Sequence, residues 1–138
     1  MNASVGNRSI GKAPGEITPM VIGNWKMNGS RFETLELLST LTAQSVHWPA
    51  VRVAVCPPTP YIGLAQALLS GSKIELGAQN LSDQPHGAFT GETAASMLKE
   101  FDCQVVLAGH SERRHFHQET DLIIAAKMEA AINVGIRP

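Results

Sequence analysis

The sequence has no excess of charge of either sign. Eleven lysines and arginines are opposed by twelve aspartates and glutamates, which gives a formal net charge of −1 at pH 7 over 138 residues. The charges are spread along the chain, without a basic cluster of the kind that binds phosphate backbones or anionic membranes. The composition therefore argues against nucleic acid and against a membrane as partners.

Long apolar runs and cysteines are also scarce. Runs such as Val105 to Ala108 are far shorter than the roughly 20 residues that cross a bilayer. Met1 to Pro19 has no apolar signal core, so we expect a cytoplasmic protein. Cys56 and Cys103 lie in apolar, strand-like surroundings and form no CxxC or Cys/His ligand pattern. This predicts two buried free thiols rather than a disulfide or a zinc site.

Residues 1–18 have no periodic apolar face and are rich in Gly, Ser, Asn and Pro. This composition predicts a flexible leader ahead of a folded region at 19–138. Gly6 to Lys12 fits the first seven places of a phosphate-binding loop, GxxxxGK, but Ala13 stands where that loop needs a magnesium-binding Ser or Thr. No strand precedes the segment, so we interpret the match as chance.

After the leader, short β-rich runs alternate with longer helical patterns. Ser30 and Glu33 have the spacing of a helix capping box, and Leu35, Leu38 and Leu41 then recur at helical spacing. Four strand–helix pairs result: the expected strands are 19–25, 50–56, 73–78 and 103–108, and the expected helices are 30–46, 61–69, 92–100 and 121–133.

This alternation predicts an α/β fold. Near-continuous apolar strands such as VRVAV and VVLA, separated by helices, are typical of a parallel sheet that helices cover. Two architectures fit, an open doubly wound sheet and a section of a βα barrel. The first strand-to-helix turn, NWKMNGS, lacks the glycine fingerprint of a dinucleotide fold, but periodicity alone does not choose between the two.

Polar side chains follow the first expected strand. Residues two apart in a strand face the same way, so Asn24 and Lys26 are expected to project together while Trp25 packs against covering helices. An amide and an ammonium at the carboxyl end of a strand form a suitable anion-contacting pair. The alternative is that Lys26 is a solvated strand end, and this segment alone does not decide between them.

The fourth expected strand ends near His110, in AGHSERRHF, at the same edge of the sheet. A short helix is expected to open at Ser111, and its positive N-terminal end disfavours an imidazolium and keeps His110 neutral near pH 7. Glu112, Arg113 and Arg114 concentrate charge beside the histidine. A histidine beside a carboxylate and opposite a lysine at this edge is a candidate for acid–base catalysis.

A metal site is the alternative for the histidines in this segment. His110, His115 and His117 lie close in sequence, but no Asp/Glu–His pattern of known spacing accompanies them. The neighbouring arginines would also repel a cation. We therefore expect no metal.

The loop at 79–91 is long for a connection from strand to helix, whose usual length is roughly 2 to 6 residues. Its polar and glycine content predicts that it projects from the domain. Four interpretations stay open: a lid, a ligand clamp, an arm that reaches a partner, or a tolerated surface insertion.

Four motifs, in this order and spacing, resemble the triosephosphate isomerase family: GNWKMN at 23–28, GAQN at 77–80, GAFTGE at 87–92 and AGHSERR at 108–114. The resemblance covers 19–138. It implies a (β/α)8 TIM barrel, of which the first four βα units, about half of the barrel, are present. The implied reaction interconverts dihydroxyacetone phosphate and D-glyceraldehyde 3-phosphate through an enediol, in glycolysis and gluconeogenesis, without a metal or an organic cofactor.

The resemblance also implies roles for individual residues. Lys26 resembles the lysine that holds the substrate phosphodianion and the developing enediolate oxygen, and Asn24 resembles the asparagine beside it. His110 resembles the histidine that polarises the carbonyl and shuttles protons between the substrate oxygens; its neutral state is a known property of the family and not a prediction of ours. Glu112 matches the carboxylate that supports the site beside that histidine, and Ser111 matches a supporting hydrogen-bonding position.

A homodimer is implied as well. Thr90, in GAFTGE, resembles the loop residue that reaches into the neighbouring subunit's active site, and Gln79, Glu92 and Arg113 match positions near that interface. In the family, the catalytic glutamate follows the sixth strand, and further phosphate-binding amides follow the seventh and eighth. We therefore expect residues 1–138 alone to lack the base and to be inactive.

Two other functions stay open at this point. One is a non-catalytic half-barrel that covers its open edges by self-association or by pairing with a separate C-terminal half. Its mark would be a discrete, concentration-independent assembly in solution. The other is a sugar-phosphate-binding protein without turnover, which predicts phosphate binding that Lys26→Ala abolishes and His110→Gln leaves unchanged.

Overall fold

The computed structural model describes residues 18–48 and 51–138, so the GxxxxGK match and nearly all of the predicted leader lie outside the described residues. No helix in these ranges is long and apolar enough to cross a membrane. The strands are β1 (Met20–Asn24), β2 (Arg52–Cys56), β3 (Ile74–Ala78) and β4 (Val105–Val106), and the helices are α1 (Arg31–Ser45), α2 (Ile62–Leu69), α3 (Ala95–Glu100), α4 (Ser111–Phe116) and α5 (Asp121–Asn133), with a 3-10 turn η1 at Thr59–Tyr61.

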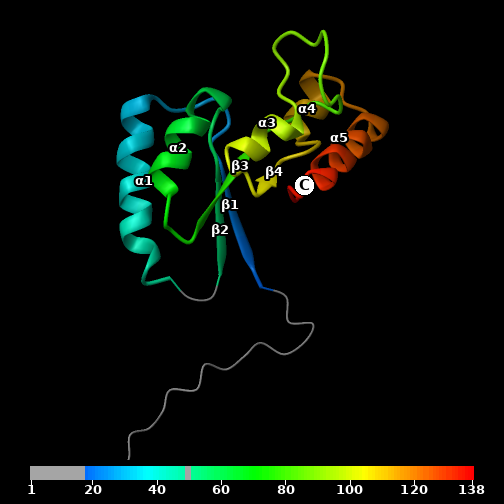
Figure 1. The fold of residues 1–138 in the computed structure, drawn as a ribbon. Coiled ribbons are helices and arrows are strands. Elements are labelled where there is room, and N and C mark those ends of the chain that lie inside the picture. The colour runs from blue at the N-terminus through cyan, green and yellow to red at the C-terminus, as the bar shows by residue number, and fades with distance from the viewer. Residues whose placement is uncertain (1–17, 49–50) are drawn as a thin grey trace, which may run out of the picture.

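The four strands form one parallel sheet in the order β1-β2-β3-β4. In register, Asn24 lies opposite Cys56, and Ala78 lies opposite Val106. An open doubly wound sheet reverses its strand order part of the way along, whereas successive barrel strands are added in one direction. The observed order is that of a barrel, and the predicted half-barrel is confirmed. Figure 1 shows α1 and α2 beside β1 and β2, with α3, α4 and α5 gathered near β4.

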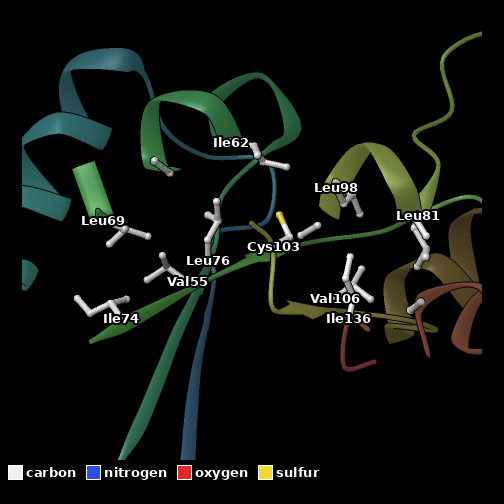
Figure 2. Close-up of a cluster of buried hydrophobic side chains, with 14 of the residues drawn as sticks. Val55, Ile62, Leu69, Ile74, Leu76, Leu81, Leu98, Cys103, Val106 and Ile136 are labelled. Atoms are coloured by element: carbon white, nitrogen blue, oxygen red, sulfur yellow. The ribbon is translucent and has the colours of Figure 1, made fainter. Parts of the chain in front are cut away.

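The main hydrophobic core lies between the sheet and the helices. Strand residues such as Val55, Leu76 and Val106 pack there against Leu38 of α1 and Leu98 of α3. Burying one such side chain contributes about 1.5–3 kcal/mol, so this layer is the chief source of stability. Figure 2 shows part of this cluster, and the residues labelled there are Val55, Ile62, Leu69, Ile74, Leu76, Leu81, Leu98, Cys103, Val106 and Ile136.

The opposite face of the sheet carries a second, smaller cluster of Ala54, Cys56 and Val105. Gly77 permits this packing, because a Cβ there would lie 2.5 Å from the Cys56 sulfur and 2.6 Å from a Val105 methyl carbon. Cys56 and Cys103 are both buried and free, as predicted. Burial raises the pKa of the Cys56 thiol to about 12 and that of the Cys103 thiol to about 11, so neither is a nucleophile near neutral pH.

An ion cluster joins three chain segments at the amino end of the strands. Arg52 of β2 donates two hydrogen bonds to the carboxylate of Glu75 in β3, at 2.7 and 2.8 Å. Arg137, beyond α5, also donates to Glu75. The backbone of Arg137 pairs with β4, since its carbonyl accepts the Val106 N–H at 2.8 Å. The end of the chain is therefore fixed to the edge of the sheet.

Most observed bounds differ from the prediction by one or two residues, and three differences affect the site or the sheet. The first strand ends at Asn24, because the backbone of Lys26 turns into a left-handed conformation with φ 54°. The third helix begins at Ala95 rather than at residue 92, because the Thr93 carbonyl accepts the backbone N–H of Ser82 at 2.8 Å and holds this segment outside the helix. The fourth strand keeps only two ladder residues.

Candidate active site

A pocket of about 210 Å³ lies where the chain leaves the carboxyl ends of the strands. It gathers residues that follow β1, β3 and β4, because parallel strands place these ends at one edge of the sheet. Six of the eight lining residues are site or interface residues predicted from the sequence. The lining consists of Asn24, Lys26, Met27, Gln79, His110, Glu112, Arg113 and His117.

Hydrogen bonds from neighbouring groups hold the turn that carries Lys26. The Lys26 N–H donates to Asn24 Oδ1 at 2.9 Å, and the Trp25 N–H donates to the Cys56 carbonyl at 3.2 Å. The side chain of Asn28 donates to the Trp25 carbonyl at 2.9 Å. A left-handed backbone costs a residue with a Cβ about 1–2 kcal/mol, so these bonds are what make the conformation of Lys26 stable.

The sequence prediction was therefore right about the proximity of Asn24 and Lys26 but wrong about its cause. The strand has already ended at Asn24, so strand alternation does not align the two side chains. The Asn24 carboxamide bends the chain instead, by accepting the Lys26 N–H. Trp25 packs against the main core, as expected.

Lys26 and Glu112 form an ion pair across the pocket. Lys26 Nζ lies 2.7 Å from Glu112 Oε1, and the two side chains are 52% and 44% exposed. The hydrogen bond from Lys26 lowers the pKa of Glu112, so this carboxylate is ionised near neutral pH. Because solvent reaches both partners, an anion entering the pocket can replace Glu112 as the partner of Lys26.

His110 precedes α4 and caps its first turn. Its Nδ1 accepts the backbone N–H of Glu112 at 3.2 Å, so this nitrogen carries no proton, and the proton of the neutral ring is on Nε2. Glu112 Oε2 lies 3.6 Å from the same Nδ1, beyond hydrogen-bonding distance. The short helix expected at Ser111 is present as α4.

Gly109 sets the direction in which His110 leaves β4. Its φ of 67° is left-handed, and a Cβ at this position would lie 2.7 Å from Ile124 Cδ1 in α5. A side chain at position 109 would therefore be strained in its backbone and would also collide with α5. The close contact between the loop and α5 fixes the position of His110 relative to the core.

A buried ionic network behind the pocket was not anticipated. Arg113 Nε lies 2.6 Å from Glu119 Oε1, and Lys127 Nζ lies 2.5 Å from the same oxygen. Lys127 also donates to Asn80 Oδ1 at 2.8 Å. The side chains of Glu119 and Lys127 are only 5% and 6% exposed. Burial favours a raised pKa for Glu119, but the hydrogen bonds from Lys127 and Arg113 outweigh it and leave the pKa below its ordinary value.

The sequence did contain a signal for this network. Lys127 is spaced three residues after Ile124 and four before Ala131, and these three are the buried residues of α5. A lysine on the buried stripe of a helix needs a buried partner. The partner, Glu119, lies outside the helix in the preceding turn, and periodicity does not locate it.

The other predicted positions lie apart from this pocket or at its margin. Thr90 and Glu92 are exposed in the segment between β3 and α3, and Ser111 is exposed in the first turn of α4; none of the three lines the pocket. His115 packs edge-on against Phe116, with ring centroids 4.7 Å apart. Across residues 18–48 and 51–138, no group of three or more His, Cys, Asp or Glu side chains is placed to hold a metal ion.

Comparison with known proteins places this geometry in a family. The family model described as triosephosphate isomerase matches residues 19–138. The chain is 51% identical over 119 residues to the triosephosphate isomerase of Dechloromonas aromatica, covering 86% of this chain and 47% of that protein. It is 53% identical over 119 residues to that of Cupriavidus taiwanensis, covering 86% and 48%.

A solved structure agrees with these relatives. The crystal structure of triosephosphate isomerase from Bartonella henselae superposes with a TM-score of 0.80 at 39% identity, covering 87% of this chain and 49% of that one. The chain thus spans about half the length of the relatives it matches. With four parallel strands in barrel order and the family model matched from 19 to 138, this chain belongs to the triosephosphate isomerase family.

Proposed function

We propose that this chain forms the lysine and histidine side of a triosephosphate isomerase active site, which interconverts dihydroxyacetone phosphate and D-glyceraldehyde 3-phosphate. The observation that carries the proposal is the single pocket shared by Asn24, Lys26 and His110. These residues come from segments separated by more than eighty positions, and each stands in a motif that resembles the family. In this role the chain needs no metal and no organic cofactor.

Lys26 supplies the charge for binding. Its ammonium contacts the substrate phosphodianion and the oxygen that becomes negative in the enediolate, and Asn24 supports the turn that presents it. Without substrate, Glu112 neutralises this ammonium. Substrate binding therefore exchanges one anionic partner of Lys26 for another, so the ammonium has a counter-charge in both states.

His110 supplies the electrophile. With Nδ1 occupied as an acceptor, Nε2 is the remaining N–H and donates to the substrate carbonyl. As the enediol forms, this group passes protons between the two substrate oxygens. The backbone N–H of Glu112 supports the histidine from the first turn of α4, and the family resemblance is our basis for assigning a supporting role to Ser111.

Isomerisation also requires a base that removes a proton from carbon. Among the described residues that line the pocket, Glu112 is the one carboxylate, and its hydrogen bond to Lys26 and its lowered pKa make it a poor base. We assign the base to the glutamate that the family carries after its sixth strand. Turnover then depends on a polypeptide segment beyond the four βα units present here.

The family resemblance adds proposals on assembly and location. We propose that Thr90 and Glu92, both exposed, contribute to a homodimer interface, with Gln79 and Arg113 close to it. We place the protein in the cytoplasm. Pairing of this chain with a separate C-terminal half remains the alternative way to complete the site.

The test separates binding from turnover. Inorganic phosphate is titrated into the isotope-labelled chain, and we expect it to shift the amide resonances around Lys26 and His110. Lys26→Ala should abolish these shifts. Lys73→Ala is the control and should leave them intact, because Lys73 lies between α2 and β3 and away from the pocket. A wild-type chain that shows no phosphate-dependent shift at these residues would refute the binding role.

Turnover is followed with glyceraldehyde 3-phosphate as substrate, and His110→Gln reveals any contaminating host enzyme. We expect wild type and variant to show the same residual rate when the base is absent. A rate that His110→Gln removes would show that the described half supplies its own base and would overturn the assignment above.

A further inference from the structure

The side chain of Gln79 makes a hydrogen bond to the backbone of its own chain. Gln79 directly follows β3, and its Nε2 donates to the carbonyl of Cys56, the last residue of β2, at 2.8 Å. The bond is partly buried, and Gln79 also lines the pocket. The family resemblance associates this residue with a subunit interface, whereas the contact gives it a role inside one protomer.

The Cys56 carbonyl is shared by two donors. A carbonyl oxygen has two lone pairs, and here the second hydrogen bond comes from the Trp25 N–H at 3.2 Å. Trp25 is the first residue after β1, and Lys26 follows it. The Gln79 carboxamide therefore holds the Cys56 carbonyl, and this carbonyl accepts the hydrogen bond from Trp25 where β1 ends.

The hydrogen bond of the Trp25 N–H lies directly before Lys26, the residue whose backbone is left-handed. Lys26 has a φ of 54°, a conformation that persists only where the surroundings fix the backbone on both sides. Asn28 fixes the carbonyl of Trp25 at 2.9 Å, and the Cys56 carbonyl fixes its N–H. If the Cys56 carbonyl is free to tilt, the Trp25 N–H loses alignment and Lys26 can return to a right-handed conformation.

We propose that Gln79 is a positioning residue for Lys26: by holding the Cys56 carbonyl it keeps the Trp25 peptide in place and the Lys26 ammonium directed at the pocket. The inference deepens the proposed function, because it concerns the lysine of that same site. Gln79 acts through the backbone and makes no contact with the reacting atoms.

The decisive variant is Gln79→Met, which keeps the length of the side chain and removes its donor. Gln66→Met is the matched control, because Gln66 also donates from Nε2, in its case to Asp102 in an exposed contact away from the pocket. Two measurements on the labelled chain need no ligand: hydrogen exchange of the Trp25 amide, and the three-bond coupling between the amide and α protons of Lys26, which reports φ.

In Gln79→Met we expect Trp25 exchange to accelerate roughly three- to tenfold, the loss associated with one hydrogen bond, and the Lys26 coupling to leave its left-handed value. The Val106 amide, paired with Arg137 at 2.8 Å, is the internal reference and should keep its rate, and Gln66→Met should change none of these signals. Phosphate affinity falls in Gln79→Met and is retained in Gln66→Met.

Unchanged Trp25 exchange and Lys26 coupling in a folded Gln79→Met chain would overturn the proposal. Equal acceleration at Trp25 and Val106 would also overturn it, since Gln79 would then stabilise the whole domain. Should Gln79→Met fail to fold, Gln79→Glu, which has the same shape and no donor when ionised, is measured in the same way. A wild-type chain that does not bind phosphate, with Lys26 still displaced in the variant, would refute the proposed function and leave the positioning role standing.

Discussion

Replacing Glu119 by glutamine is the most direct test of the buried network behind the pocket. Glu119 Oε1 accepts from both Arg113 and Lys127, at 2.6 and 2.5 Å. Glutamine keeps the shape but removes the negative charge, so the Lys127 ammonium, 6% exposed, would remain buried without a counter-charge. Breaking a buried pair in this way costs about 3–5 kcal/mol, which is a large share of the stability of a domain of this size.

The stability lost in Glu119→Gln depends on pH, and the pKa of Glu119 gives the direction of that dependence. Its pKa is lower in the folded state than its ordinary value, so the carboxylate stabilises the fold at every pH above the ordinary glutamate range. That contribution is lost as the pH falls through the lower, folded pKa. The gap in unfolding free energy between wild type and Glu119→Gln should therefore be constant from pH 7 down to about pH 5 and should narrow below it.

The assay is urea unfolding followed by circular dichroism at a series of pH values. Glu129→Gln is the control, because Glu129 lies on the same helix, α5, and is exposed. We expect a loss of about 3 kcal/mol or more for Glu119→Gln and less than about 0.5 kcal/mol for the control. A loss below about 1 kcal/mol at pH 7, or a gap that does not narrow in acid, would refute the claim that Lys127 depends on Glu119 as its buried counter-charge.

Three further experiments, two substitutions and one chemical labelling, probe the packing around the site. Gly77→Ala places a Cβ 2.5 Å from the Cys56 sulfur and 2.6 Å from a Val105 methyl carbon, and it is expected to cost about 1–3 kcal/mol in urea unfolding. Cys56→Ala in the same chain removes the first of these collisions and should recover part of the loss, and the absence of any recovery would contradict a collision with the sulfur as a cause. Gly109→Ala meets Ile124 at 2.7 Å at a left-handed φ, so we expect a similar or larger loss together with shifted His110 ring resonances, whereas unmoved resonances would disprove that Gly109 positions the histidine. Cys56 and Cys103, buried with pKa values raised to about 12 and about 11, should react with iodoacetamide at pH 8 far more slowly in the folded chain than in urea; labelling at comparable rates would contradict their burial.

Local sequence patterns were sufficient to predict the strands and helices but not the order of the strands in the sheet. The alternation of apolar strands and periodic helices predicted four parallel strands, and all four are present. Whether such strands form an open sheet or a barrel depends on strand order, which is a non-local property. Here the motifs around Lys26 and His110 decided the question, because they resembled a barrel family when periodicity had left both architectures open.

Within the site, residues that follow a strand end were predictable, and residues that act through long-range contacts were not. Lys26 and His110 follow strands of a parallel sheet, so their convergence follows from topology. The partnership of Glu119 with Lys127 depends on how a turn folds back onto a helix, and sequence spacing does not contain that information. The left-handed φ of Lys26 was missed for the same reason, since the acceptor on Cys56 comes from another strand.

The contacts that prepare the lysine and the histidine all lie within the described half of the barrel. The Lys26 turn is held by Asn24, Asn28 and a carbonyl of β2, and the His110 ring is held by the first turn of α4. Both arrangements are held by hydrogen bonds among the described residues, and the proposed function assigns phosphate binding to the first and carbonyl polarisation to the second. Under that proposal, phosphate binding reports on the Lys26 turn, whereas isomerisation also requires the base. A variant that disturbs the Lys26 turn should therefore lose both, and loss of the base alone should leave phosphate binding intact.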